Sequence, residues 1–119
     1  MRKFALVFLS FLPLVLSAAD WSGWLGPLGD GTTPESNWQP EFEDPCWKSK
    51  IGLGFSAVSV ADGKLYAMGH DGKKNGGKES IFFFFFLFGR SVWKNSYPAP
   101  LVDYLHEGGP CSSPVVNDC

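Results

Sequence analysis

The sequence feature that most restricts the fold is an Asp-Gly pair, Asp62-Gly63, between two short segments rich in β-forming residues. In residues 56–60, Val58 and Val60 lie two positions apart, which is the alternation of a strand with one buried face. A type I′ turn needs a positive φ at both central residues, and an Asp-Gly pair tolerates this conformation. The pair therefore predicts a hairpin whose second strand is 64–68.

The residues that follow carry the signals of two more strands. Turn signals stand at 69–72 and at Gly89-Arg90, and the polar, glycine-rich residues 73–79 predict a loose loop. The apolar residues 81–87 predict a third strand, and a fourth is expected to begin at 91–94. We therefore expect an all-β fold of four short antiparallel strands joined by tight turns, which is typical of one blade of a β-propeller.

Two motifs in this unit resemble the pyrroloquinoline-quinone-like (PQQ-like) β-propeller repeats. Residues 56–66 read SAVSVADGKLY, and residues 89–93 read GRSVW. The family usually has Asp-x-x-Thr-Gly-Lys-x-x-Trp at the second motif, so Phe85 and Phe88 stand where Asp and Thr would bond the turn backbone. The resemblance implies that Trp93 packs between neighbouring blades.

The most specific part of this resemblance lies in residues 20–31, which read DWSGWLGPLGDG. PQQ-like propeller proteins exported by bacteria have a similar Asp-Trp-Pro-x-Trp-Arg-Gly-Pro-x-x-Asp-Gly, and Ser22 and Leu25 are the departures here. Glycine and proline exclude a helix, and the two tryptophans are expected to be anchors that bury on another surface. We expect residues 20–45 to form an extended Trp/Gly/Pro-rich arm.

The first blade and its connecting loop are expected to span 46–110, beginning with a short strand at 46–52 in which Trp47 packs inward. Residues 111–119 repeat the start of this blade and predict a second one. The equivalent pairs, each 56 positions apart, are Ser56 and Ser112, Val60 and Val116, and Asp62 and Asp118.

The length of the chain bears on whether a propeller could close. Closure takes about four to eight blades, for which 119 residues are too few. The alternatives are a fragment, a chain that assembles with others, and a degraded copy. Truncation is favoured because Cys119 stands where the repeat would place the turn glycine. The implied partners are the remaining propeller blades or another protein.

Residues 1–19 have the pattern of a secretory signal peptide. Arg2-Lys3 precedes a mainly apolar run of 13 residues, 4–16, and small residues precede a cleavage site after Ala19. A membrane anchor is the alternative, but a span needs about 20 apolar residues and Pro13 interrupts this run. We expect export to a bacterial periplasm or beyond, with no membrane span in the mature chain.

The charge of the mature chain bears on its partners. The whole chain has 10 Lys and Arg against 12 Asp and Glu, and removal of Arg2 and Lys3 leaves eight basic groups and a net charge of −4. This charge argues against a surface for nucleic acid or for an anionic membrane.

Residues 82–86 are five consecutive phenylalanines, followed by Leu87 and Phe88. The run is too short to span a membrane. As a strand it would be apolar on both faces, which fits a strand sandwiched between neighbours and is an aggregation hazard without them. A frame slip in a repetitive codon tract would also produce such a run.

Two groups of titratable residues are candidates for chemistry. Asp103, His106 and Glu107 could ligate a metal or supply a general base, although a solvated loop is the commoner origin of such a cluster. His70 and Asp71 lie in a tight turn, where the Asp is expected to bond backbone N–H groups.

The three cysteines, Cys46, Cys111 and Cys119, allow one disulfide in an oxidising compartment, with three possible pairings. Unpaired thiols are an equal alternative. The spacing contains no Cys-x-x-Cys pair, so a metal site has little support from these residues.

The resemblance implies one leading function and one alternative. The first is a non-catalytic binding or assembly scaffold, like the PQQ-like repeats of outer-membrane assembly factors. The alternative is the N-terminal part of a PQQ-dependent (quinoprotein) alcohol or sugar dehydrogenase, which would hold PQQ and calcium on the propeller axis below a Cys-Cys pair. The chain has no such pair, and the resemblance places the family's ligand and base positions in blades that this sequence does not contain, so no catalytic, cofactor-binding or metal-binding residue is assigned.

Overall fold

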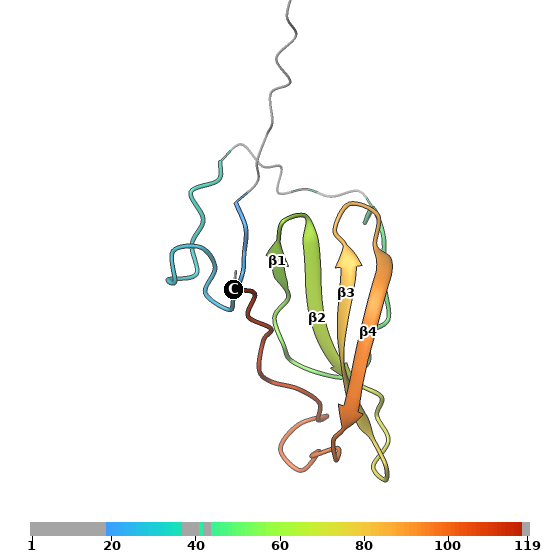
Figure 1. The fold of residues 1–119 in the computed structure, drawn as a ribbon. Coiled ribbons are helices and arrows are strands. Elements are labelled where there is room, and N and C mark those ends of the chain that lie inside the picture. Colours follow the sequence, from blue (N-terminus) through green and yellow to red (C-terminus); the bar gives the residue numbers. More distant parts are fainter. Residues whose placement is uncertain (1–18, 37–40, 42–43, 118–119) are drawn as a thin grey trace, which may run out of the picture.

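The computed structural model describes residues 19–36, 41 and 44–117 (Figure 1). The predicted signal peptide, 1–18 with its apolar run, lies outside the described residues, as do Asp118 and Cys119. The described part has no helix and forms one antiparallel sheet of four strands in the order β1-β2-β3-β4. The strands are β1 Ser59–Ala61, β2 Lys64–His70, β3 Lys78–Phe85 and β4 Arg90–Pro98. The prediction of an all-β fold with four antiparallel strands is confirmed.

The β1–β2 hairpin turns at the predicted Asp-Gly pair. Asp62 has φ 49° and Gly63 has φ 68°, and the flanking residues Ala61 and Lys64 are paired. Asp62 is the one non-glycine residue with a positive φ in the described part of the chain. A left-handed conformation at both central positions is what a type I′ turn requires.

The predicted first strand, 56–60, is wrong in its bounds because its N-terminal part bonds a different segment. Ser56 donates its hydroxyl to the carbonyl of Ser112 at 2.5 Å, and the N–H of Ala57 bonds Ser113 Oγ at 2.9 Å. Ser56 and Ala57 therefore bond the C-terminal segment instead of pairing with β2, and β1 begins only at Ser59. Pairing with β2 resumes upstream, where Leu53 and His70 exchange two backbone hydrogen bonds.

The third strand begins three residues before the predicted Ile81 and ends before Leu87. The loop that precedes it is closed by Asp71, whose carboxylate accepts the N–H groups of Lys73 and Lys78 at 3.1 and 3.2 Å. Lys78 is thereby set beside the end of β2, and the loop, 71–77 in place of the expected 73–79, is more tightly bonded than expected. At the other end the chain turns back at Gly89, which has φ 58° and donates its N–H to the Phe85 carbonyl.

The phenylalanine run is divided between the sheet and a turn. Alternation places Phe82 and Phe84 on one face, with ring centroids 6.0 Å apart, and Phe83 and Phe85 on the other. Phe84 is buried, whereas Phe88 is 76% exposed because it lies in the turn after β3. The expectation of a strand apolar on both faces thus holds up to Phe85 and is wrong beyond it.

Trp47 packs inward as expected, but no strand forms at 46–52. Its ring lies 5.9 Å from that of Phe84, and its Nε1–H donates to the Phe86 carbonyl at 2.8 Å. A Cβ on Gly89 would meet the same ring at 2.3 Å. The indole therefore occupies the inside of the β3–β4 turn, where the Asp and Thr of the resembled motif are missing.

The arm and the C-terminal segment lie together beside β1 (Figure 1). Trp21 and Val60 exchange two backbone hydrogen bonds of 2.8 Å, and Val116 donates its N–H to the Ser22 carbonyl at 2.8 Å. The Trp21 ring lies against Gly26, whereas Trp24 is 65% exposed. One of the two predicted tryptophan anchors is therefore largely uncovered.

Candidate functional site

One face of the sheet gathers aromatic side chains from β2, β3 and β4. Its members, called the aromatic face below, are Tyr66, Phe83, Phe85, Trp93 and Tyr97. Phe83 stacks on Tyr66 with centroids 5.2 Å apart and meets Trp93 edge-to-face at 6.0 Å. Phe85 and Trp93 are each 44% exposed, so the rings touch one another without being covered. These ring contacts join Tyr66, Phe83, Phe85 and Trp93 into one apolar patch, which is typical of a binding surface. Tyr97 lies four positions further along β4, and its hydroxyl donates to Glu79 at 2.6 Å.

The outer strand β4 extends this surface to an open edge. All nine of its residues are exposed, and the sheet ends with it in the described part of the chain. Its outer N–H and C=O groups are available for pairing with another strand. Lys94 lies near the middle of β4 with its ammonium 5.1 Å from the Phe82 ring centre, and a charge there disfavours pairing between identical edges.

A groove of about 360 Å³ borders the aromatic face where the C-terminal segment approaches the sheet. Tyr66, Met68 and Ile81 form one wall, and residues 114–117 form the other. The lining is mainly apolar, so the groove suits an aliphatic or aromatic side chain better than a charged group.

A larger hollow, about 690 Å³, lies between the arm and the turns at the ends of β1 and β3. Two of its three acidic side chains bond backbone groups, since Asp20 accepts the N–H of Asp62 at 3.1 Å and Glu35 accepts that of Ala19 at 2.5 Å. Trp21 and Phe86 supply its apolar walls. Thr33 supplies the one hydroxyl of the lining, and the lining has no basic side chain or histidine that would activate it.

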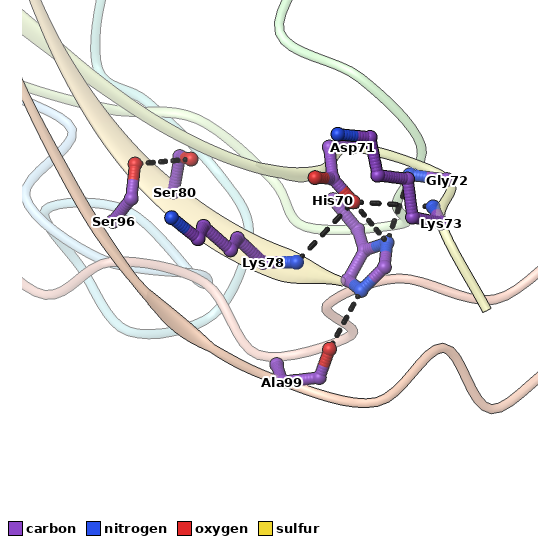
Figure 2. A network of polar contacts seen from close by, with 8 residues as sticks. All are labelled: His70, Asp71, Gly72, Lys73, Lys78, Ser80, Ser96 and Ala99. Carbon is purple, nitrogen blue, oxygen red and sulfur yellow. Dashed lines mark hydrogen bonds and ion pairs between the residues drawn. The ribbon is translucent and has the colours of Figure 1, made fainter. Parts of the chain in front are cut away.

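The predicted group of His70 and Asp71 forms a hydrogen-bond network at the end of β2 (Figure 2). The His70 side chain is fully buried, and its Nδ1 accepts the N–H of Gly72 at 2.9 Å. Nε2 therefore carries the proton of the neutral ring and donates it to the Ala99 carbonyl, 3.0 Å away. The imidazole thus ties β2 to the residues that follow β4.

Asp71 bonds the backbone of its own loop, as the sequence predicts. Its carboxylate lies 3.7 Å from His70 Nδ1, an atom that already accepts a hydrogen bond from Gly72. The N–H of Lys73, and to a smaller extent that of Lys78, holds the pKa of Asp71 below its ordinary value. His70 and Asp71 therefore act as structural groups of the loop.

The second predicted group, Asp103 with His106 and Glu107, is not assembled into a metal site. Asp103 pairs with Lys74 at 2.7 Å, and this contact lowers the pKa of Asp103. The His106 ring instead packs edge-on against Phe55, with centroids 4.9 Å apart. No group of three or more His, Cys, Asp or Glu that could hold a metal ion occurs among the described residues.

Two of the three predicted cysteine pairings include Cys119, which lies outside the described residues. Cys46 and Cys111 are both exposed free thiols. The structure therefore contains no Cys46–Cys111 bridge, one of the three pairings that the sequence allows.

Comparisons with known proteins do not place this chain in a family. No protein-family model, curated protein or solved structure matches it. The described residues also contain no helix with the length and apolar character needed to cross a bilayer. The case for a function therefore comes from the geometry of the sheet and from the sequence motifs.

Two features of the site could not be predicted from the sequence. The first is the contact between Trp47 and Gly89, which lie 42 positions apart in the sequence. Nothing in the sequence around either residue predicts that the two are in contact. The aromatic face needs the register between Phe83 and Trp93, which depends on a bulge between Phe83 and Phe84. The run of phenylalanines did indicate an aromatic surface on the third strand. The alternation of side chains along that strand could not show which rings stay exposed.

Proposed function

We propose that the chain is the beginning of an exported PQQ-like β-propeller repeat protein that serves as a non-catalytic binding or assembly scaffold. Its partners are further blades or another protein, and they bind at the aromatic face. The proposal takes its fold family from the motifs at 56–66, 89–93 and 20–31. The proposed binding role rests on the aromatic face and on the open edge of β4.

Repeat-equivalent residues that lie side by side support the propeller reading. Ser56 bonds the Ser112 carbonyl and Ala57 bonds Ser113 Oγ, and both pairs are 56 positions apart. In a propeller the first strands of successive blades are neighbours around the axis, so equivalent residues are expected to approach one another. A second blade that continues from 112–117 would begin beside the first one.

The observation that carries the binding role is the exposure of the aromatic face. Phe85, Trp93 and Tyr97 are uncovered on a sheet whose buried apolar side chains are Ala61, Ala67 and Phe84. Burying a large apolar side chain contributes about 1.5–3 kcal/mol, so a partner that covered this face would gain binding free energy from each ring that it buries.

The scaffold role is tested on the complete product of the gene, purified from the exported fraction. Dye reduction is measured with alcohol and sugar substrates after PQQ and calcium are added, and no activity above that of the protein without PQQ is expected. PQQ-dependent activity would overturn the scaffold role in favour of the quinoprotein dehydrogenase. Export itself is checked by mass spectrometry of the same material, in which the N-terminal residue is expected to be Asp20.

A further inference from the structure

The two histidines of the chain form the same local turn. Both stand in a His-acid-Gly sequence, His70-Asp71-Gly72 and His106-Glu107-Gly108. In each, Nδ1 accepts the N–H of the glycine two residues later, at 2.9 and 3.0 Å. The glycines have φ 79° and 89°, which favours glycine at both positions. Each turn therefore places the proton of the neutral imidazole on Nε2.

The two turns differ in what Nε2 faces. Nε2 of His70 is buried against a backbone carbonyl, as described above. Nε2 of His106 lies 3.8 Å from Sγ of Cys111, an exposed free thiol. The Nε2–H of His70 thus bonds a backbone carbonyl, whereas the Nε2–H of His106 points at a thiol.

The His106 ring is held in this position by packing. Phe55 meets the ring at 74°, and the Phe55 N–H bonds the Pro110 carbonyl at 2.8 Å. A Cβ on Gly109 would lie 2.4 Å from the Leu53 carbonyl oxygen, so the loop that joins His106 to Cys111 rests directly on the backbone before β1. The imidazole and the sulfur are therefore placed on one packed loop.

We propose that Cys111 is a site of reversible mixed-disulfide formation with small disulfides, and that His106 is its positioning residue. In this reaction the Cys111 thiolate attacks one sulfur of the small disulfide. A new S–S bond forms, the old S–S bond breaks, and the other half leaves as a thiolate that takes a proton from water. The chain gains one half of the small disulfide, and the Cys111 proton has gone to solvent.

The role of His106 follows from which form of the sulfur reacts. The thiolate is the nucleophile in disulfide exchange, and hydrogen bonds to anionic acceptors are roughly twice as strong as neutral ones. An N–H 3.8 Å from the sulfur can bond the thiolate during the attack and hold it in place, although a thiolate bonded in this way is also a weaker nucleophile. The inference does not depend on the propeller reading or on export, because it rests on residues 106–111 and on their packing against Leu53 and Phe55.

Cys46 is the internal control for this proposal. It is exposed like Cys111, but the chain has two histidines, of which one is buried and the other faces Cys111. The full chain with Cys119→Ser is reacted with oxidised glutathione, and the modification of each thiol is followed by mass spectrometry. We expect Cys111 to react faster than Cys46 by about twofold to fourfold, because roughly half of the free energy of one net hydrogen bond is lost in the lower nucleophilicity of the bonded thiolate.

The matched variant is His106→Asn in the same background. Its side-chain oxygen can still accept the Gly108 N–H, but it has no group in the place of Nε2–H, so the Cys111 rate should fall to that of Cys46 while the Cys46 rate stays unchanged. In urea the two thiols should react equally in both proteins. Equal rates in the folded parent chain, or an advantage of Cys111 that survives His106→Asn, would overturn the proposal.

Discussion

At the scale of single residues, neighbouring glycines in the loop before β3 serve different purposes. Gly76 has φ 65° with open space around its Cα, so its role is conformational. Gly77 lies where a Cβ would be 2.3 Å from the Lys73 carbonyl oxygen and 2.6 Å from the His70 ring, so its role is to leave room. The buried imidazole is possible because the loop before β3 passes it at Gly77, a residue without a side chain.

Substitution of these glycines separates the two roles. Gly77→Ala should lower the free energy of unfolding by about 1–3 kcal/mol, the usual cost of overpacking. Gly76→Ala should cost about 1–2 kcal/mol through its left-handed conformation, and Gly76→Asn should recover most of that loss because Asn tolerates positive φ. Urea denaturation measures all three, and equal costs for Gly77→Ala and Gly76→Asn would contradict this assignment.

The Asp71 carboxylate makes the same loop sensitive to acid. The Lys73 and Lys78 N–H groups lower its pKa in the folded state, so the stability it contributes is present above the ordinary value of 3.8. That contribution is lost as the pH falls through the lowered pKa. In NMR titrations the Lys73 and Lys78 amide shifts should move with a midpoint below 3.8, and Asp71→Asn should abolish the transition. A midpoint at or above 3.8 in the parent chain would count against these bonds.

At the scale of elements, the β3–β4 turn depends on a side chain from outside the hairpin. Phe85 and Phe88 cannot bond the turn backbone as Asp and Thr would. Trp47 supplies both a ring against Gly89 and a hydrogen bond to the Phe86 carbonyl. The hairpin is therefore completed by the segment that precedes the sheet.

Removing parts of Trp47 should show both contributions. Trp47→Phe deletes the indole N–H and should cost about 0.5–1.5 kcal/mol, the net worth of one hydrogen bond. Trp47→Ala removes the packing as well and should cost more, about 2–4 kcal/mol for a half-buried aromatic ring. Thermal unfolding followed by circular dichroism measures both variants. The control is Trp24→Ala, at a ring that is 65% exposed, and a loss there as large as for Trp47→Ala would refute the special role of Trp47.

At the scale of the whole molecule, the sheet has more apolar surface than its own chain covers. The arm and the C-terminal segment lie beside β1 (Figure 1), whereas the residues of β4 are exposed and Phe85 and Trp93 of the aromatic face are each 44% exposed. A single sheet with one open face is marginally stable and prone to association. The uncovered surface therefore governs the behaviour of the isolated chain.

Residues 20–119, the 100 residues that the predicted cleavage after Ala19 would leave, should associate in solution through this face. Phe85→Lys combined with Trp93→Thr should shift size-exclusion elution toward the monomer and reduce the binding of a hydrophobic dye. The matched control is Leu105→Lys, which adds a charge at a residue 82% exposed in the loop after β4 and should change little. A sharp monomer peak for the parent chain would show that the face is not a site of association.

The sequence by itself determined the local geometry of this protein, and the tertiary structure decided which surfaces are buried. The Asp62-Gly63 turn, the four-strand all-β fold and the backbone bonds of Asp71 were predictable because each depends on residues close in sequence. The ends of β1, the exposure of Phe88 and the place of Trp47 were not, because each is settled by partners more than 20 residues away or by the register of β4. For the two histidines, the shared His-acid-Gly sequence sets the same tautomer. Only the fold decides that one faces a buried carbonyl and the other a thiol.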